Sequence, residues 1–357
     1  MVNGGHRQHG FWKGKKVFLT GHTGFKGSWA TLLLQRLGAE ISGYSLQPEP
    51  GPQLFRIADV NEGIQSYYGD ITDYNGLFTA MNEVQPEIVL HLAAQPLVRL
   101  SYDEPIHTFN TNIMGTVYLL EAARQVSSVK VVVNVTSDKC YDNPGHVVHA
   151  FQEGSPMGGA DPYSASKGGA ELVAAAYSKS YYTHGEKVLA SARAGNVIGG
   201  GDFAKDRIVP DIIRSLESHQ PLTIRNPNAV RPWQHVLDCI HGYLNLAEHL
   251  WHYGHDFDGG WNFGPDETAI LSVSDIVEQA LHYMSVKPEV VYETRAQPYE
   301  AKCLMLNSDK ARQQLGWKPK LTAQEAIQWS MEWYNDYLLQ QDMRQVTLQQ
   351  INRYMDK

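Results

Sequence analysis

A glycine-rich turn follows the first apolar run of the chain. The stretch TGHTGFKG, residues 20–27, comes directly after KKVFL and holds Gly21, Gly24 and Gly27 at every third position. A strand, a glycine turn and a helix in this order place backbone N–H groups at a helix N-terminus, where a pyrophosphate can bind. The spacing differs from the more common G-x-G-x-x-G, so a plain strand-to-helix turn is the alternative. The position inside a series of strands and helices favours dinucleotide binding.

Short apolar runs alternate with helical patterns through the first half of the chain. Strand-like runs lie at 16–20, 40–46, 64–70, 87–94 and 129–137. Helical patterns separate them, notably at 27–38 and 110–126. Uniformly apolar strands are typical of a parallel sheet that has helices on both faces. The sequence therefore predicts an α/β fold with a Rossmann-like, doubly wound parallel sheet.

The pattern changes after residue 190. Gly, Asn, Pro and Arg become frequent, and helical patterns recur at about 208–217, 235–251, 272–285 and 321–340. We expect a smaller, mixed C-terminal domain that binds the substrate. The expected division is an NAD-binding domain at 12–190 with a returning segment at 230–260, a substrate domain at 191–229 and 261–345, and a flexible tail at 1–11.

Composition excludes several classes of protein. The 357 residues carry a formal net charge of −8 and no basic run, which argues against a nucleic-acid partner. No apolar stretch has the roughly 18 residues of a membrane span, and the polar N-terminus does not look like a signal peptide. We therefore expect a cytoplasmic protein. Cys140, Cys239 and Cys303 are too few and too scattered for a disulfide framework, and the 15 histidines form no zinc-like cluster, so no metal is expected.

Two short motifs indicate catalysis. Tyr163 and Lys167 share one face if YSASKGGAELVAAAY is helical, and an ammonium beside a phenol favours the phenolate. The alternative is a surface pair. The second motif, VTSDKCY at 135–141, leaves the fifth strand at the edge where α/β sheets place their sites. Its triplet Ser137–Lys139 offers a hydroxyl, an acid and a base, and the alternative is an ordinary polar loop.

These motifs occur together in one known family. Over nearly its whole length the chain resembles the extended short-chain dehydrogenase/reductases, through TGHTGFKG, HLAAQ, TNIMGT, YSASK, RPWQHVLD and WNFG. The Ser-Asp-Lys triplet is similar to the Thr-Asp-Glu signature of the nucleotide-sugar 4,6-dehydratases, with Lys139 in place of the usual Glu. The longer forms GHTGFKGSW, HLAAQPLVRLSYDEP and QPYEAKCLMLNSDKAR are similar to the dehydratases that act on CDP-glucose.

The resemblance implies a lyase that converts CDP-glucose to CDP-4-keto-6-deoxyglucose and water. Tyr163 would take the proton of the sugar O4, supported by Lys167, while NAD accepts hydride from C4. Ser137 would bind O4, Lys139 would remove the C5 proton, and Asp138 would protonate the departing C6 hydroxyl. The hydride then returns to C6, so NAD is regenerated in each turnover.

The implied cofactor is NAD. The residues that would bind it are Gly21, Thr23, Gly24, Phe25, Lys26, Gly27, Asp70, Ile71, Ala93, Ala94, Tyr163 and Lys167. An acidic residue is expected at the end of the second strand to bind the ribose, but Tyr44 and Ser45 lie there instead. That leaves NADP open on the residues alone. With His22 in a position often held by Gly or Ala, we expect weakly bound or readily exchanged NAD.

The substrate contacts implied by the resemblance lie in the second half of the chain. Arg231 would bind the pyrophosphate, because a guanidinium suits phosphate oxygens. Arg193 and Asn196, placed after the sixth strand, would line the same cleft, and Arg295 and Glu300 would reach the nucleotide. A surface or loop-stabilising role is the alternative for each.

A homodimer or homotetramer is the expected assembly. The family commonly pairs the helices at 110–126 and 163–182 in a four-helix bundle, and both carry apolar surface. Three other functions remain open on the residues. They are a nucleotide-sugar 4-epimerase, an NADP-dependent reductase and a dinucleotide sensor without catalysis.

Overall fold

The computed structural model describes residues 8–143, 150–183, 185, 187–266, 269–293 and 304–357. A sheet of seven parallel strands has the order β11–β7–β5–β4–β1–β2–β3. The strands are β1 (Lys16–Thr20), β2 (Glu40–Ser45), β3 (Gln65–Tyr68), β4 (Ile88–His91), β5 (Val131–Val135), β7 (Val188–Ala194) and β11 (Gly259–Phe263). The strand order reverses between β1 and β4, so the sheet is doubly wound, as the sequence predicts.

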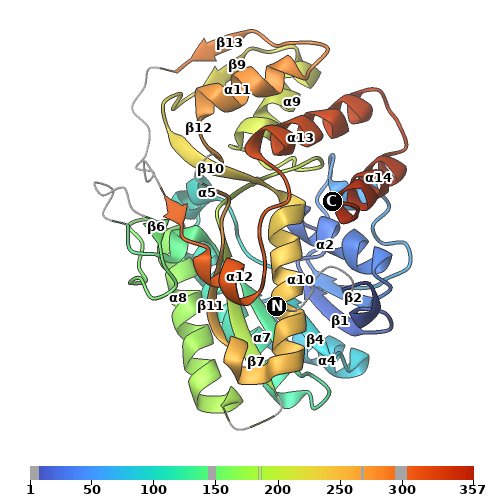
Figure 1. Ribbon diagram of the computed structural model, residues 1–357, viewed down its shortest axis with the longest axis vertical. Coiled ribbons are helices and arrows are strands. Elements are labelled where there is room, and N and C mark those ends of the chain that lie inside the picture. Colours follow the sequence, from blue (N-terminus) through green and yellow to red (C-terminus); the bar gives the residue numbers. More distant parts are fainter. Residues whose placement is uncertain (1–7, 144–149, 184, 186, 267–268, 294–303) are drawn as a thin grey trace.

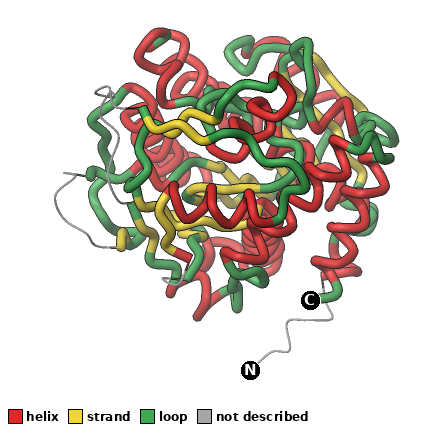
Figure 2. The backbone as a smooth tube through the Cα atoms, turned by 90° about the horizontal axis from the view of Figure 1, so that it is seen from above, coloured by secondary structure: helices red, strands yellow, loops and turns green. Residues whose placement is uncertain are grey.

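Helices cover both faces of this sheet (Figures 1 and 2). One face carries α2 (Phe25–Arg36) and α10 (Val236–Tyr253), and the other carries α4 (Tyr74–Val84), α7 (Gly115–Gln125) and α8 (Pro162–Tyr177). Successive strand residues point to opposite faces. Val17 and Leu19 therefore join the core on the α2 side, whereas Phe18 joins the core on the α4 side. Burial on both faces explains why the strands are uniformly apolar.

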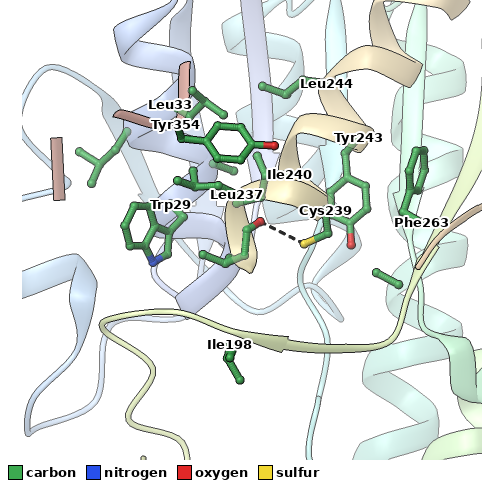
Figure 3. Close-up of a cluster of buried hydrophobic side chains, with 14 of the residues drawn as sticks. Trp29, Leu33, Ile198, Leu237, Cys239, Ile240, Tyr243, Leu244, Phe263 and Tyr354 are labelled. Carbon is green, nitrogen blue, oxygen red and sulfur yellow. Dashed lines mark hydrogen bonds between the residues drawn. The ribbon is translucent and has the colours of Figure 1, made fainter. Parts of the chain in front are cut away.

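The core on the α2 side also receives the last helix of the chain, α14 (Met343–Met355). Figure 3 shows Trp29 and Leu33 of α2 with Leu237 and Ile240 of α10, and Tyr354 of α14 beside them. The sequence predictions end at residue 340 and omit α14. Its polar sequence, MRQVTLQQINRYM, has too few apolar residues to give a helical pattern.

Short elements connect the main ones. They are α1 (Gln8–Phe11), α3 (Leu54–Ile57), α5 (Val98–Asp103), α6 (Pro105–Phe109), the π-helical turns η1 (Asn110–Met114) and η3 (Ser178–Tyr182), the 3-10 turns η2 (Asp138–Cys140) and η4 (Gly254–Phe257), and β6 (Ala150–Phe151). The predicted flexible tail at 1–11 is wrong for residues 8–11, which are helical. Phe11 packs against Trp251 of α10, with ring centroids 5.9 Å apart, and this contact anchors α1.

Most of the second region lies above the large sheet in Figure 1. Its strands are β8 (Asn196–Ile198), β10 (Val230–His235) and β12 (Ile270–Ser272) in one sheet, β9 (Leu222–Ile224) paired with β13 (Val290–Tyr292), and β14 (Met305–Leu306) paired with β6. Its helices are α9 (Ile208–Ser218), α11 (Val273–His282), α12 (Asp309–Gln314) and α13 (Ala323–Leu338). In the described part of the chain, no helix combines the length and the apolar character needed to cross a membrane.

The boundaries between the two regions differ from the predicted ones. A division after residue 190 would cut β7, and a division after residue 260 would cut β11, although both strands belong to the large sheet. β10 belongs to the three-stranded sheet of the second region, not to the returning segment. The chain crosses between the regions at the ends of β7, β10 and β11, which local composition does not reveal.

Candidate active site

The glycine turn between β1 and α2 has room for backbone but not for side chains. A Cβ atom on Gly21, which has a φ of +76°, would lie 2.8 Å from the backbone nitrogen of Ala93 after β4. A Cβ atom on Gly27 would lie 2.0 Å from the carbonyl oxygen of Gly21. Gly24 is the N-cap of α2, and no side chain caps the helix. The N–H groups of the first turn therefore have no side-chain acceptor, and this turn fits a pyrophosphate.

Hydroxyl groups close the end of β2. The Oγ1 atom of Thr23 lies 2.7 Å from Oγ of Ser45, and it also donates to the carbonyl of Leu46 at 3.2 Å. His22 is fully buried, and its Nε2 lies 3.0 Å from Oγ of Ser66. Its ring packs on Gly43, where a Cβ would lie 2.3 Å away. Burial lowers the pKa of His22 to about 4, so the ring is neutral at pH 7.

Two residues that follow β3 face different surroundings. The carboxylate of Asp70 accepts hydrogen bonds from the backbone nitrogen and the hydroxyl of Thr72, at 2.8 and 2.7 Å. Ile71 is buried against Gly115 of α7, where a Cβ would meet the Ile71 side chain at 2.8 Å. Asp70 is thus held within its own turn at the carboxyl edge of the sheet, the edge at which dinucleotides bind in this type of fold.

Tyr163 and Lys167 lie on one face of α8, and the predicted helix is confirmed. Asp161 caps the helix by accepting a hydrogen bond from the backbone nitrogen of Ser164 at 2.9 Å, and Pro162 occupies its first turn. The side chains of Tyr163 and Lys167 are both buried. The Nζ atom of Lys167 lies 5.9 Å from the centre of the Tyr163 ring.

Burial moves the pKa values of this pair in opposite directions. It raises the pKa of Tyr163 to about 12, although a hydrogen bond with Ser137 and the charge of Arg207 act against the shift. It lowers the pKa of Lys167 to about 8, and the charge of Lys26 adds to this effect. At pH 7 Tyr163 is therefore a neutral phenol, and most of Lys167 is protonated. Additional positive charge near the phenol would be needed to make it a base.

The predicted triplet lies where β5 ends and η2 begins, in contact with α8. The hydroxyl of Ser137 donates to Oδ1 of Asp138 at 2.9 Å, and the backbone nitrogen of Lys139 lies 3.3 Å from the Ser137 hydroxyl. Asp138 is buried, and burial raises the pKa of its carboxyl group, while the charge of Lys139 opposes the shift. The protonated form of Asp138 is thereby favoured, which suits a proton donor.

Arg207, at the N-cap of α9, is a site residue that the sequence reasoning missed. Its Nη1 donates to Oδ2 of buried Asp202 at 2.8 Å, and its charge lowers the pKa of Tyr163. The signal was available in GGGDFAKDR, where an acid and a base occur in a glycine-rich loop. No periodic pattern places such a loop next to α8, so the position of Arg207 could not be predicted.

Two of the predicted substrate residues, Arg231 and Asn196, lie on neighbouring strands of the three-stranded sheet. Arg231 of β10 is largely buried, donates to the carbonyl of Val230 at 3.0 Å, and lowers the pKa of Asp138 through its charge. Asn196 of β8 lies next to Trp233 of β10 in the three-stranded sheet. Arg231 is thus near the triplet.

Arg193, expected after the sixth strand, lies within β7. It forms a buried ion pair with Glu171 of α8, with Nη2 and Oε2 2.7 Å apart. Because its guanidinium is held by protein groups, we no longer assign Arg193 to the substrate. Arg295 and Glu300 lie outside the described residues. In the described part of the chain, Cys140 and Cys239 are buried free thiols, and no group of His, Cys, Asp and Glu could hold a metal ion.

Several known proteins are similar to this chain in sequence. The model of the GDP-mannose 4,6 dehydratase family matches residues 18–329. CDP-glucose 4,6-dehydratase of Salmonella typhimurium is 48% identical over 351 residues, which cover 97% of each chain. dTDP-glucose 4,6-dehydratase of Shigella flexneri is 25% identical, over 89% of this chain and 92% of the relative.

Among solved structures, UDP-glucose 4-epimerase of Thermotoga maritima superposes with a TM-score of 0.79 at 22% identity. The superposition covers 90% of this chain and 99% of the epimerase, and it shows a shared fold. The glycine turn, the Tyr163–Lys167 pair and the long matches in sequence lead to one conclusion. The chain belongs to the GDP-mannose 4,6-dehydratase family, within the extended short-chain dehydrogenase/reductases.

Proposed function

We propose that this chain is a CDP-glucose 4,6-dehydratase, which converts CDP-D-glucose to CDP-4-keto-6-deoxy-D-glucose and water. The observation that carries the proposal is the contact between the Tyr163–Lys167 helix and the Ser137–Asp138–Lys139 turn, in which Ser137 and Asp138 are buried. An oxidation at C4 needs only the first pair. A buried acid and a nearby amine beside that pair are what an elimination also needs. The name of the relative at 48% identity supports the choice of CDP-glucose.

NAD fits the glycine turn, where Gly21 and Gly27 leave no space for side chains and the N-terminus of α2 lacks a side-chain cap. When bound, NAD would supply a hydride acceptor for C4 and return the hydride to C6. Thr23 and Ser45 would hold the ribose, and Asp70, Ile71, Ala93 and Ala94, which follow β3 and β4, would complete the NAD site. Phe25 and Lys26 belong to the first turn of α2. Lys26 adds positive charge near Lys167 and Asp138.

In the oxidation step, Tyr163 takes the proton from the sugar O4. The positive charges of Lys167 and Arg207 help to stabilise the phenolate that acts as base, and NAD, when bound, would supply the additional positive charge. Ser137 contacts both Tyr163 and Asp138, so its hydroxyl can hold O4 between the two halves of the site. This step leaves a ketone at C4, which acidifies the neighbouring C5 proton.

In the elimination step, the amine of Lys139 removes the C5 proton, and the electron pair of the C5–H bond forms the C5–C6 double bond. The C6–O bond breaks, and protonated Asp138 gives its proton to the departing hydroxyl, which leaves as water. Hydride then adds to C6, and C5 regains a proton from Lys139. The balance is the loss of one water molecule. Lys139 is restored when it returns its proton to C5, and Tyr163 and Asp138 are restored when the proton that Tyr163 took from O4 passes to Asp138.

Arg231 and Asn196 are the side chains that we assign to the diphosphate of the substrate. They lie on neighbouring strands of the three-stranded sheet. Guanidinium groups bind phosphate oxygens through paired, charge-assisted hydrogen bonds. Arg295 and Glu300 remain proposals from the sequence for the nucleotide end.

A homodimer is the assembly that the surface supports. The packed helices α6 and α8 carry exposed apolar side chains, with Ile106 85% and Leu172 64% exposed. Large apolar side chains exposed on neighbouring helices are typical of an interface. We propose that a second copy of this chain covers them in a four-helix bundle.

Mass spectrometry of the purified protein with NAD and CDP-glucose tests the function, with UDP-glucose and dTDP-glucose in parallel. We expect the loss of one water molecule from CDP-glucose alone, without net formation of NADH. A sugar isomer of unchanged mass would instead identify a 4-epimerase. No change with any of the three sugars would contradict the proposed reaction.

A further inference from the structure

A buried ion pair joins α8, the helix that carries Tyr163 and Lys167, to β7. Glu171 of α8 is four residues beyond Lys167, and Arg193 lies in β7. Their bond is bidentate, with Nε to Oε1 at 2.9 Å and Nη2 to Oε2 at 2.7 Å. The side chains are only 5% and 4% exposed. A paired fork of this kind fixes orientation as well as distance.

The ion pair holds the catalytic turn at both of its ends. The hydroxyl of Thr136, directly before Ser137, donates to Oε1 of Glu171. The Nη1 atom of Arg193 donates to the hydroxyl of Tyr141, directly after Cys140, at 2.7 Å. Residues 137–140 therefore lie between Thr136 and Tyr141, which are the two anchors of the turn because each is hydrogen-bonded to this ion pair.

The second anchor is itself tied to the far end of the sheet. The Tyr141 hydroxyl donates to Oδ1 of Asn262 in β11 at 2.7 Å. The Asn262 amide in turn donates to the carbonyls of Phe151 and Asn307, at 2.9 and 3.1 Å. The Tyr141 ring also stacks on Phe151, with centroids 5.1 Å apart. Tyr141 is thus a rigid link, fixed by its ring and by its hydroxyl.

A buried ion pair is costly in desolvation and adds little net stability compared with apolar packing. Gly260 is part of the same arrangement, because a Cβ atom there would lie 2.3 Å from Nη2 of Arg193. The space beside Gly260, the charge of Glu171 and several hydrogen bonds are thus all used to hold the Arg193 guanidinium, which we do not assign to the substrate. The arrangement is explained if the ion pair holds neighbouring residues in position.

We propose that the Arg193–Glu171 pair, acting through Thr136 and Tyr141, positions the Ser137–Asp138–Lys139 turn relative to Tyr163 and Lys167. The inference rests on the proposed function for its kinetic consequences. Because Glu171 follows Lys167 by one helical turn, the oxidation groups and the elimination groups share one support. Tyr141 and Thr136 are positioning residues that act through the turn they hold.

Releasing one anchor should affect the elimination more than the oxidation. Tyr163 and Lys167 are held by α8 itself, and only Ser137 of the turn assists the oxidation, whereas both Asp138 and Lys139, the groups of the elimination, depend on the turn. In enzymes generally, a misplacement of about 1 Å can cost on the order of a hundredfold in rate. A loosened turn would therefore slow proton transfer at C5 and C6 while hydride transfer from C4 continues.

The test is Tyr141→Phe, which removes one hydroxyl and keeps the ring. We expect kcat to fall by about tenfold to a hundredfold with the KM for CDP-glucose nearly unchanged. Reduced nicotinamide should accumulate in the first turnover, seen by its near-ultraviolet absorbance. Hydrogen exchange measured by mass spectrometry should rise at residues 137–140 and stay unchanged in α8. This readout needs no substrate, so it judges the positioning role even if the wild-type protein fails to dehydrate CDP-glucose.

Tyr182→Phe is the matched control. Tyr182 is equally buried, and its hydroxyl donates to the carbonyl of Leu120 at 3.0 Å, away from the catalytic turn. We expect normal kcat and no accumulation of reduced nicotinamide in this variant. If both variants gave the same kinetics and the same exchange, the positioning role would be refuted.

A second pair of variants tests the other anchor and covers the case in which Tyr141→Phe does not fold. Thr136→Val keeps the shape and loses the donor to Glu171, whereas Thr136→Ser keeps the donor. We expect Thr136→Val to show the slowed elimination and Thr136→Ser to recover most of the wild-type rate. Equal rates for the two variants would overturn the proposal.

Discussion

The hydroxyl of Tyr354 donates a 2.8 Å hydrogen bond to the carboxylate of Asp238, and both residues are buried. Tyr354 lies near the end of α14, and Asp238 lies in the first turn of α10 (Figure 3 shows Tyr354 against the α10 residues). The same Oδ1 atom accepts from the backbone nitrogen of Lys320 at 2.8 Å. A single carboxylate thus joins α10 to the last helix and to the segment before α13. Burial raises the pKa of Asp238 to about 6.

Asp238→Asn should therefore change how stability depends on pH. The pKa of an Asp in an unfolded chain is about 3.9, so the folded protein binds an extra proton between about pH 4 and pH 6. Ionisation of Asp238 lowers the free energy of unfolding. The loss increases as the pH rises through this window, up to roughly 3 kcal/mol. Asn keeps an acceptor for both donors and has no charge. The free energy of unfolding of the variant, relative to wild type, should rise across the window in urea titrations. A difference that does not vary with pH would contradict this assignment.

Buried histidines should make the wild-type protein less stable as the pH falls, which is opposite to the effect of Asp238. Burial lowers the pKa of His235 and of His91 to about 3, against 6.5 in an unfolded chain. The unfolded chain then binds more protons than the folded one, so their stabilising contribution is complete above about pH 6.5 and is lost as the pH falls. We expect the free energy of unfolding to drop from about pH 6.5 to pH 4. His235 caps α10 by accepting from the backbone nitrogen of Leu237 at Nδ1. His235→Asn supplies a side-chain oxygen as acceptor in its place and removes one titrating ring, so this slope should become smaller. An unchanged slope would show that His235 does not contribute.

The parts of this molecule that depend on local pattern could be predicted from the sequence. The strands from β1 to β5 and the helix with Tyr163 and Lys167 follow from periodicity of two and of 3.6 residues. The triplet was found because parallel strands bring their carboxyl ends to one edge of the sheet. Family resemblance added the roles of these residues, which spacing alone leaves open.

The parts that depend on distant contacts could not be predicted. Arg193 is an arginine beside candidate substrate residues in the sequence, and only the fold brings Glu171 and Tyr141 to its guanidinium. The contact between Tyr354 and Asp238 joins residues 116 positions apart. α14 has almost no apolar pattern in its sequence. A few buried side chains and hydrogen bonds are enough to hold it against α10, and these contacts cannot be seen in a local pattern.

Lys139→Met should separate the two chemical steps. The amine of Lys139 is assigned to the C5 proton, whereas oxidation at C4 depends on Tyr163. We expect kcat for dehydration to fall by about 10²- to 10⁴-fold, the usual contribution of a general base. Reduced nicotinamide should accumulate with CDP-glucose in single-turnover absorbance measurements. Tyr163→Phe is the comparison, because it should abolish both dehydration and this accumulation. If Lys139→Met dehydrated CDP-glucose at the wild-type rate, another group would have to be the C5 base.

Leu172→Glu should convert the proposed dimer into monomers. Leu172 is 64% exposed on α8, and burying a carboxylate at that position in an interface would be strongly unfavourable. Size-exclusion chromatography with light scattering should give twice the chain mass for wild type and the single chain mass for the variant. Leu339→Glu is the matched control, because Leu339 is 69% exposed at the end of α13, away from the packed helices α6 to α8. We expect this control to remain dimeric. A monomeric wild-type protein, or dissociation of both variants to the same degree, would place the interface elsewhere or exclude it.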